Sequence, residues 1–251
     1  MLTNLIAGAG YLAEGIKLLA HKRVLPFVWL PILFNVLIYY FLFQGLYEFG
    51  LGKIDGVMST LPSWLDFIGS LLRWIFVILM SVIIAFSFST VATLLGAPFY
   101  GLLAEQIAVE KTGEAPAISL SWKSLLAIIP RTLLRETQKL LYYIVRLIPL
   151  FLLWLIGFFI AVVQPLVSIL WFLFGAKMLS IQYTDFAFDN DGMNFRTTKK
   201  TLKSNRAISL GFGATTQITL MIPFISIFII PAAVCGATAL YYDHLVKQKS
   251  A

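Results

Sequence analysis

The sequence contains few charged residues. Only 12% of its 251 residues are Asp, Glu, Lys or Arg, whereas 59% are hydrophobic; soluble domains average about 25% charged and about 45–50% apolar residues. A soluble domain of this length could not bury so much apolar surface, so the composition excludes a soluble enzyme, a disordered chain and a nucleic-acid-binding module. It predicts an integral membrane protein. The net charge of +7 then either sets the topology, attracts anionic lipid or serves an anionic substrate.

Residues that bind metals or perform catalysis are also scarce. The single cysteine, Cys235, excludes an intrachain disulfide, and its apolar neighbours indicate a buried side chain. His21 and His244 lie in different terminal segments and fit no metal-ligand spacing. The sequence has no GxxxxGK[ST] motif, which argues against an ATP-driven pump. We expect no metal, no cofactor and no enzymatic activity, because no nucleophile–base pair occurs.

Four long stretches of the sequence carry no charged residue, at positions 24–47, 74–104, 147–176 and 207–242. Each exceeds the about 20 residues that a spanning helix needs. Gln164 and Pro165 divide the third stretch into halves of about 15 residues, roughly 22 Å of helix, which is less than the about 30 Å of a hydrocarbon core. Pro223 and Pro231 interrupt the fourth stretch. Each of these two stretches is therefore either one kinked span or a re-entrant hairpin.

The distribution of basic residues favours the re-entrant hairpins. With two spans and two hairpins, 17 of the 19 basic residues face the cytoplasm and only the loop 48–73 is external; four simple spans would put the two most basic segments on opposite sides. We therefore predict an all-α protein with one membrane domain over residues 1–251 and both termini cytoplasmic. Its spans are about 24–47 and 74–104, and its hairpins about 147–176 and 207–242. Re-entrant backbone must be covered by protein or line a wet cavity, which predicts oligomerisation.

A basic amphipathic helix is predicted over residues 121–146, after a turn at 111–116. Arg131, Arg135 and Lys139 are spaced by four and fall on one helical face. Two interpretations stay open. The helix could lie on anionic headgroups, or its basic face could line an anion pathway, because arginine presents a fork of donors that suits oxyanions.

Three further features carry charge. The acidic cluster 185–191 lacks the spacing of a calcium loop and is interpreted as a cytoplasmic turn. The basic run 196–206 is predicted to form a surface helix that contacts headgroups or a partner subunit. Glu105 closes the second predicted span and is either a functional group or a solvated residue at the membrane edge.

Taken in order, several unusual strings resemble the CysZ family of bacterial inner-membrane sulfate permeases. They extend over most of the chain, from about residue 10 to 243. The strings are Ala97–Phe99, Gly101–Gln106, Pro130–Arg131, Arg135–Glu136, Gln138–Lys139, Trp171–Phe174, Ile181–Tyr183, Phe188–Asn190, Phe212–Ala214, Met221–Pro223 and Val234–Ala239.

The resemblance implies a multi-pass, all-helical protein of the bacterial inner membrane that takes up sulfate for cysteine biosynthesis. It implies two long spanning helices, partly penetrating hairpins and a homo-oligomer, a dimer or larger. The string at the ion entrance of the family corresponds here to Gly101, Leu102, Leu103, Ala104 and Glu105. The charged residues on the following helix of the family correspond here to Arg131, Arg135, Glu136 and Lys139, which the resemblance implies as the lining of the ion pathway.

One departure from the family lies before the first span. Relatives can carry two adjacent arginines associated with bound sulfate, where this sequence has Leu25 and Pro26. Lys22 and Arg23 lie slightly upstream and are candidate substitutes for an anion site.

The leading hypothesis is a sulfate permease or channel, with sulfite as a further candidate substrate and membrane lipid as a partner. A dianion in a low-dielectric pore requires fixed positive charge, which Arg131 and Arg135 would supply, tempered by pairing with Glu105 or Glu136. The alternative is a non-transporting membrane scaffold that binds lipid or a partner protein. A lipid-modifying enzyme is the weakest alternative.

Overall fold

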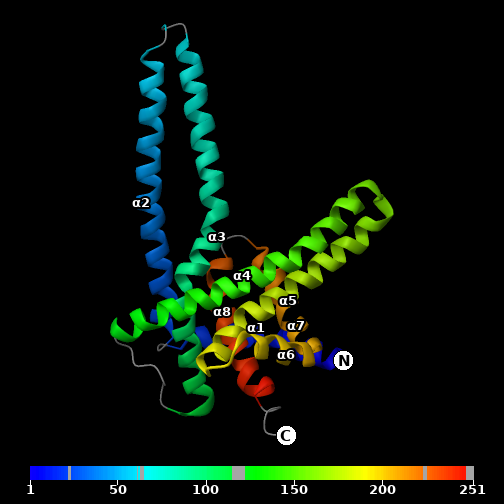
Figure 1. Cartoon of the computed structure of the whole chain (residues 1–251). Helices are drawn as coiled ribbons and strands as arrows, with labels where there is room; N and C mark the ends of the chain where they lie inside the picture. Colours follow the sequence, from blue (N-terminus) through cyan, green and yellow to red (C-terminus); the bar gives the residue numbers. More distant parts are fainter. Residues whose placement is uncertain (22–23, 61, 63–64, 115–121, 223–224, 247–251) are drawn as a thin grey trace. The chain divides into compact units, whose positions relative to one another are not determined.

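The computed structural model describes residues 1–21, 24–60, 62, 65–114, 122–222 and 225–246, and every regular element among them is helical (Figure 1). The all-α prediction is therefore confirmed. The elements are α1 (Leu2–Leu19), α2 (Leu25–Met58), α3 (Asp66–Thr112), α4 (Trp122–Phe159), the 3-10 helix η2 (Ala161–Val163), α5 (Gln164–Asn190), α6 (Phe195–Ser204), α7 (Arg206–Leu220), α8 (Ser226–Leu240) and the π-helix η3 (Tyr241–Leu245).

The chain divides into two compact units, residues 30–96 and residues 1–29 with 97–251. The first unit is an antiparallel pair formed by most of α2 and the first part of α3 (Figure 1). Arg73 of α3 donates from Nε and Nη2 to Asp55 Oδ1 of α2 at 3.0 and 2.7 Å. The segment 48–73 is mostly helical rather than a loop, because α2 continues to Met58 and α3 begins at Asp66.

Within the described part of the chain, four helices are long and apolar enough to cross a membrane: α2 over Leu25–Met58, α3 over Asp66–Ile83, α4 over Ile129–Phe159 and α5 over Gln164–Asn190. Large exposed apolar side chains along α2 to α5 fit a lipid-facing surface. The structure is thus that of an all-α membrane protein. At 34 and 47 residues, α2 and α3 extend for about 50 and 70 Å, beyond a hydrocarbon core of about 30 Å.

Helices α4 and α5 form a helical hairpin (Figure 1). The chain reverses through Ile160 and η2, and Pro165 lies in the first turn of α5, where its missing N–H costs no helical hydrogen bond. The charge-free part of α4, from Leu147 to Phe159, is about 20 Å long at 1.5 Å per residue. The fourth charge-free stretch is likewise divided between two helices, α7 and α8, of 15 residues each.

Helix α1, which the sequence does not predict, is part of the core of the larger unit. Helix α1 packs against α7 and α8 through glycines. A Cβ on Gly15 would collide with the carbonyl oxygen of Ala232, and one on Gly211 would collide with that of Leu5. These glycines allow helix backbones to touch, as small residues do in membrane proteins. Ala232 and Gly236 of α8 lie in this interface.

Candidate functional site

The predicted pathway residues of α4 lie against the last turns of α5. We call this set the α4/α5 charge cluster. It contains three cations and three carboxylates, so its formal charges cancel. The members are Arg131, Arg135, Glu136, Lys139, Asp185 and Asp189.

The centre of the cluster is a buried pair of Arg135 and Asp185. Arg135 donates from Nε to Asp185 Oδ2 at 2.8 Å and from Nη2 to Oδ1 at 2.7 Å. The hydroxyl of Thr198 in α6 donates to the same Oδ1 at 2.8 Å. Arg135 is 8% exposed and Asp185 fully buried. Two parallel charge-assisted bonds are the strongest geometry available to an arginine and a carboxylate.

The other two cations of the cluster also have carboxylate partners. Arg131 Nη2 lies 3.1 Å from Asp189 Oδ1 and contacts the Asp189 carbonyl oxygen, at the exposed edge of the cluster. Lys139 is buried, forms an ion pair with Glu136 and lies 4.4 Å from the ring centre of Phe186. Glu136 also accepts from Gln182 Nε2 at 3.0 Å.

The pairing differs from that predicted in two respects. Glu136 pairs with Lys139 rather than with an arginine, and Asp185 and Asp189 are the carboxylates that hold the two arginines. The interpretation of 185–191 as a turn is wrong for most of that segment, because α5 continues to Asn190. The spacing of four between Asp185 and Asp189 matches that of the α4 basic row, and this signal could have indicated the pairing.

The string 101–105 of α3 lies next to the cluster. Asn190 Nδ2 donates to the Gly101 carbonyl oxygen at 2.8 Å, and Gly101 and Leu102 line a cavity of about 20 Å³ together with the cluster. A cavity of this size holds about one water molecule. Leu103, Ala104 and Glu105 are buried but do not line that cavity. Two of the five predicted entrance residues therefore face the charge cluster directly.

Not every predicted site can be placed. Lys22 and Arg23 lie outside the described residues, and α2 begins at Leu25, immediately after Val24. Among the residues that the structure describes, no group of three or more His, Cys, Asp or Glu side chains is arranged to hold a metal ion.

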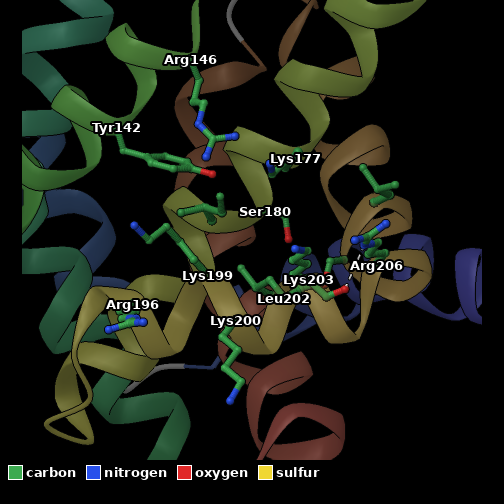
Figure 2. Close-up of a pocket in the computed structure, with 13 residues that line it drawn as sticks. Tyr142, Arg146, Lys177, Ser180, Arg196, Lys199, Lys200, Leu202, Lys203 and Arg206 are labelled. Carbon is green, nitrogen blue, oxygen red and sulfur yellow. Dashed lines mark hydrogen bonds between the residues drawn. The ribbon is translucent and has the colours of Figure 1, made fainter.

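A second site, which we call the basic pocket, is not apparent from the sequence. It is a cavity of about 700 Å³ between α4, α5, α6 and α7 (Figure 2). Tyr142, Ser180, Ile181, Leu202, Ser209 and Leu210 form part of its lining. The run 196–206 is helical but is divided between α6, which ends at Ser204, and α7, which begins at Arg206. The basic side chains of α6 meet those of three other helices. The seven basic residues that line the pocket are Arg146, Lys177, Arg196, Lys199, Lys200, Lys203 and Arg206.

Comparisons with known proteins identify the family of the chain. The family model described as "Sulfate transporter CysZ/Etoposide-induced protein 2.4" matches residues 11–231. A protein of Salmonella typhimurium named sulfate transporter CysZ is 38% identical over 237 residues, covering 94% of this chain and 92% of the relative. Its namesake in Pseudomonas fluorescens is 37% identical over 254 residues, covering 97% and 98% of the two chains. The chain therefore belongs to the family of sulfate transporter CysZ and etoposide-induced protein 2.4.

Proposed function

We propose that the protein conducts sulfate across the bacterial inner membrane, and that Gly101–Glu105 and the α4/α5 charge cluster line its path. Two relatives of nearly full-length similarity carry the name sulfate transporter CysZ. The observation that carries the assignment of residues is the burial of Arg135, Glu136, Lys139 and Asp185 around a small cavity that Gly101 also lines. Ionisable groups buried among membrane helices are typical of ion pathways.

The cluster could conduct a dianion by exchanging partners. Sulfate oxygens present the same kind of acceptor to an arginine fork as carboxylate oxygens do. The exposed Arg131–Asp189 pair would exchange first, because Arg131 is half exposed. The buried Arg135–Asp185 pair would follow. Competition from Asp185 and Asp189 keeps sulfate binding weak, which conduction requires.

In this proposal the path is closed at the cluster, where the cavity has a volume of only about 20 Å³. Conduction therefore requires α4 and α5 to separate at the cluster. In this proposal the ion pairs act as the gate, since sulfate replaces their carboxylates one at a time. Supply of the sulfur for cysteine biosynthesis would be the cellular role of this flux.

The topology that accompanies this function has two spanning helices, α2 and α3, and two re-entrant hairpins, α4/α5 and α7/α8, with both termini in the cytoplasm. Support comes from the charge-free ends of α4 and α5, which fall short of a bilayer core, and from the 15-residue lengths of α7 and α8. The backbone N–H and C=O groups at the hairpin tips must be shielded from lipid, and contacts between subunits of a homo-oligomer would shield them. The protein would act as a channel-like permease and not as an enzyme.

The test is uptake of radiolabelled sulfate into liposomes that contain only this protein. We expect uptake by the wild type and a loss of at least about tenfold in Arg131→Gln, because one of the two exchangeable cations is removed. Arg73→Gln is the matched control, since Arg73 also forms an exposed ion pair with an aspartate, Asp55. No uptake by the wild type would favour the scaffold hypothesis, and unchanged uptake by Arg131→Gln would refute the assigned path.

A further inference from the structure

The basic pocket differs from the charge cluster in having no internal counter-charge. None of its seven basic residues lies within 4.0 Å of a carboxylate of the described part of the chain. Cations gathered on four helices repel one another unless an anion lies among them. The pocket is therefore complementary to a strongly anionic ligand.

Aromatic contacts hold some of these cations in place. Tyr142 of α4 lies at the pocket, with Lys199 Nζ 4.6 Å, Arg146 Cζ 5.2 Å and Lys177 Nζ 6.0 Å from its ring centre (Figure 2). Cations within about 6 Å of a ring are attracted to it. Basic residues from three helices are thus drawn to one ring, which leaves their N–H groups able to donate to a ligand.

A buried hydroxyl adds a donor to the same pocket. Ser180 of α5 lines the pocket and is 1% exposed, and its Oγ has no hydrogen-bond partner among the described residues. Figure 2 shows Ser180 among the basic side chains. Buried hydroxyls are almost always satisfied. An oxyanion in the pocket would satisfy this one.

The position of the pocket along the hairpin indicates the kind of anion. Arg146 and Lys177 are the charged residues that border the charge-free stretch 147–176, so the pocket lies at the base of the apolar part of the α4/α5 hairpin. Beside it, Leu141, Ile144 and Val145 of α4 are 62%, 47% and 54% exposed. A ring of cations where an apolar surface begins is the arrangement that meets a phospholipid headgroup.

We propose that the basic pocket binds the headgroup of an anionic phospholipid. Lys199, Lys203 and the Ser180 hydroxyl donate to its phosphate oxygens, and its acyl chains follow the exposed apolar side chains of the hairpin. The volume of about 700 Å³ suits a glycerophosphate headgroup and exceeds the space that a single tetrahedral anion needs. This inference does not rest on the proposed sulfate flux.

The test uses the full chain, purified in an uncharged detergent, with native mass spectrometry of bound phosphatidylglycerol and phosphatidylcholine. Two double variants remove cations from different helices of the pocket, Lys199→Gln/Lys203→Gln and Arg146→Gln/Lys177→Gln. The control, Lys17→Gln/Lys53→Gln, removes two exposed lysines outside the pocket. A fourth variant, Ser180→Ala, removes only the buried hydroxyl.

We expect the wild type to prefer phosphatidylglycerol, and each pocket double variant to bind it on the order of 30-fold more weakly, because each basic residue near an anionic surface contributes a factor of about five. Ser180→Ala should weaken binding severalfold, and the control should match the wild type. Unchanged binding by both pocket variants would overturn the proposal. Displacement of the lipid by millimolar sulfate or inorganic phosphate would also overturn it, since the ligand would then be a soluble oxyanion. Sulfate uptake is not the readout, so the lipid site and the sulfate path can fail separately.

Discussion

Arg135 of α4 and Asp185 of α5 form two parallel hydrogen bonds in a buried site, 50 residues apart in sequence. Removing both charges from water costs several kcal/mol per ion. The two bonds between Arg135 and Asp185, together with the hydrogen bond from the Thr198 hydroxyl to Asp185, offset this cost. A buried pair of this kind is poor evidence for stability but strong evidence of interdependence, because neither partner can be removed alone without leaving a bare charge.

Single and double variants of this pair should therefore behave differently. Arg135→Gln should destabilise the protein by about 3–5 kcal/mol, because Asp185 is left buried and unpaired. The double variant Arg135→Leu/Asp185→Leu should recover most of this loss yet conduct no sulfate. Thermal unfolding in detergent and proteoliposome uptake measure the two effects. Equal destabilisation by the single and the double variant would contradict this account of the pair.

The glycines of α1 allow a matched test of helix packing. Gly15→Ala should destabilise the larger unit by about 1–3 kcal/mol, because its Cβ would meet the Ala232 backbone of α8 and force the helices apart. Gly10 lies on the same helix with nothing within 4 Å of its would-be Cβ. Gly10→Ala should leave stability unchanged or raise it by about 0.5–1 kcal/mol. Similar unfolding temperatures for the two variants would refute the close approach of α1 and α8.

The re-entrant topology can be tested at the tip of the α4/α5 hairpin. The side chain of Val162 in η2 is 89% exposed, so no other part of the described chain covers it. If the hairpin only dips into the bilayer, Val162→Cys should resist a membrane-impermeant thiol reagent applied from outside the cell, since the tip stays in the hydrocarbon core. The native Cys235 is buried and should not react with the reagent.

Two further cysteines calibrate that experiment. Ser59→Cys, between α2 and α3, should react from outside, and Ser204→Cys, at the end of α6, should react only after the cells are opened. Rapid labelling of Val162→Cys from outside would show that α4 and α5 cross the membrane completely, as their total lengths allow.

Lys111 at the end of α3 joins three elements. Its Nζ donates to Glu14 Oε1 at 2.6 Å and to Asp243 Oδ2 at 2.9 Å. Burial lowers the pKa of Lys111, but these hydrogen bonds and charges outweigh it and raise the pKa above its ordinary value of 10.5. The resulting stabilisation is fully present below about pH 10.5 and is lost as the pH rises through the folded-state pKa.

Lys111→Gln should therefore lower the unfolding temperature at pH 7 by a small amount, since exposed and half-exposed pairs contribute about 1 kcal/mol or less. The difference from the wild type should shrink as the pH rises above 10.5 and disappear above the raised pKa of the folded protein, where Lys111 becomes neutral. Lys17→Gln is the control, because Lys17 forms no ion pair among the described residues. A difference that stays constant through pH 11 would rule out the ion pairs as its cause.

Part of the charge cluster was accessible from sequence and part was not. The spacing of Arg131, Arg135 and Lys139 predicted one basic face of a helix, and α4 carries it. The partners, Asp185 and Asp189, repeat the same spacing at the end of α5. In the sequence they belong to an acidic cluster that also fits a turn, so the sequence does not identify them as partners. Helical periodicity identifies a face, but it does not say which other face meets it.

The sequence by itself determined the membrane character, the helical class and the interruptions of the apolar stretches, because hydropathy, charge and proline act within one helix. Only the tertiary structure decided that Arg131 and Arg135 of α4 are neutralised by α5, and that the cations of α6 gather with Arg146 and Lys177 in an uncompensated pocket. The physical reason is that compensation of charge depends on residues tens of positions apart. The same excess of basic residues that predicted topology is thus divided by packing into a neutral cluster and a strongly positive pocket.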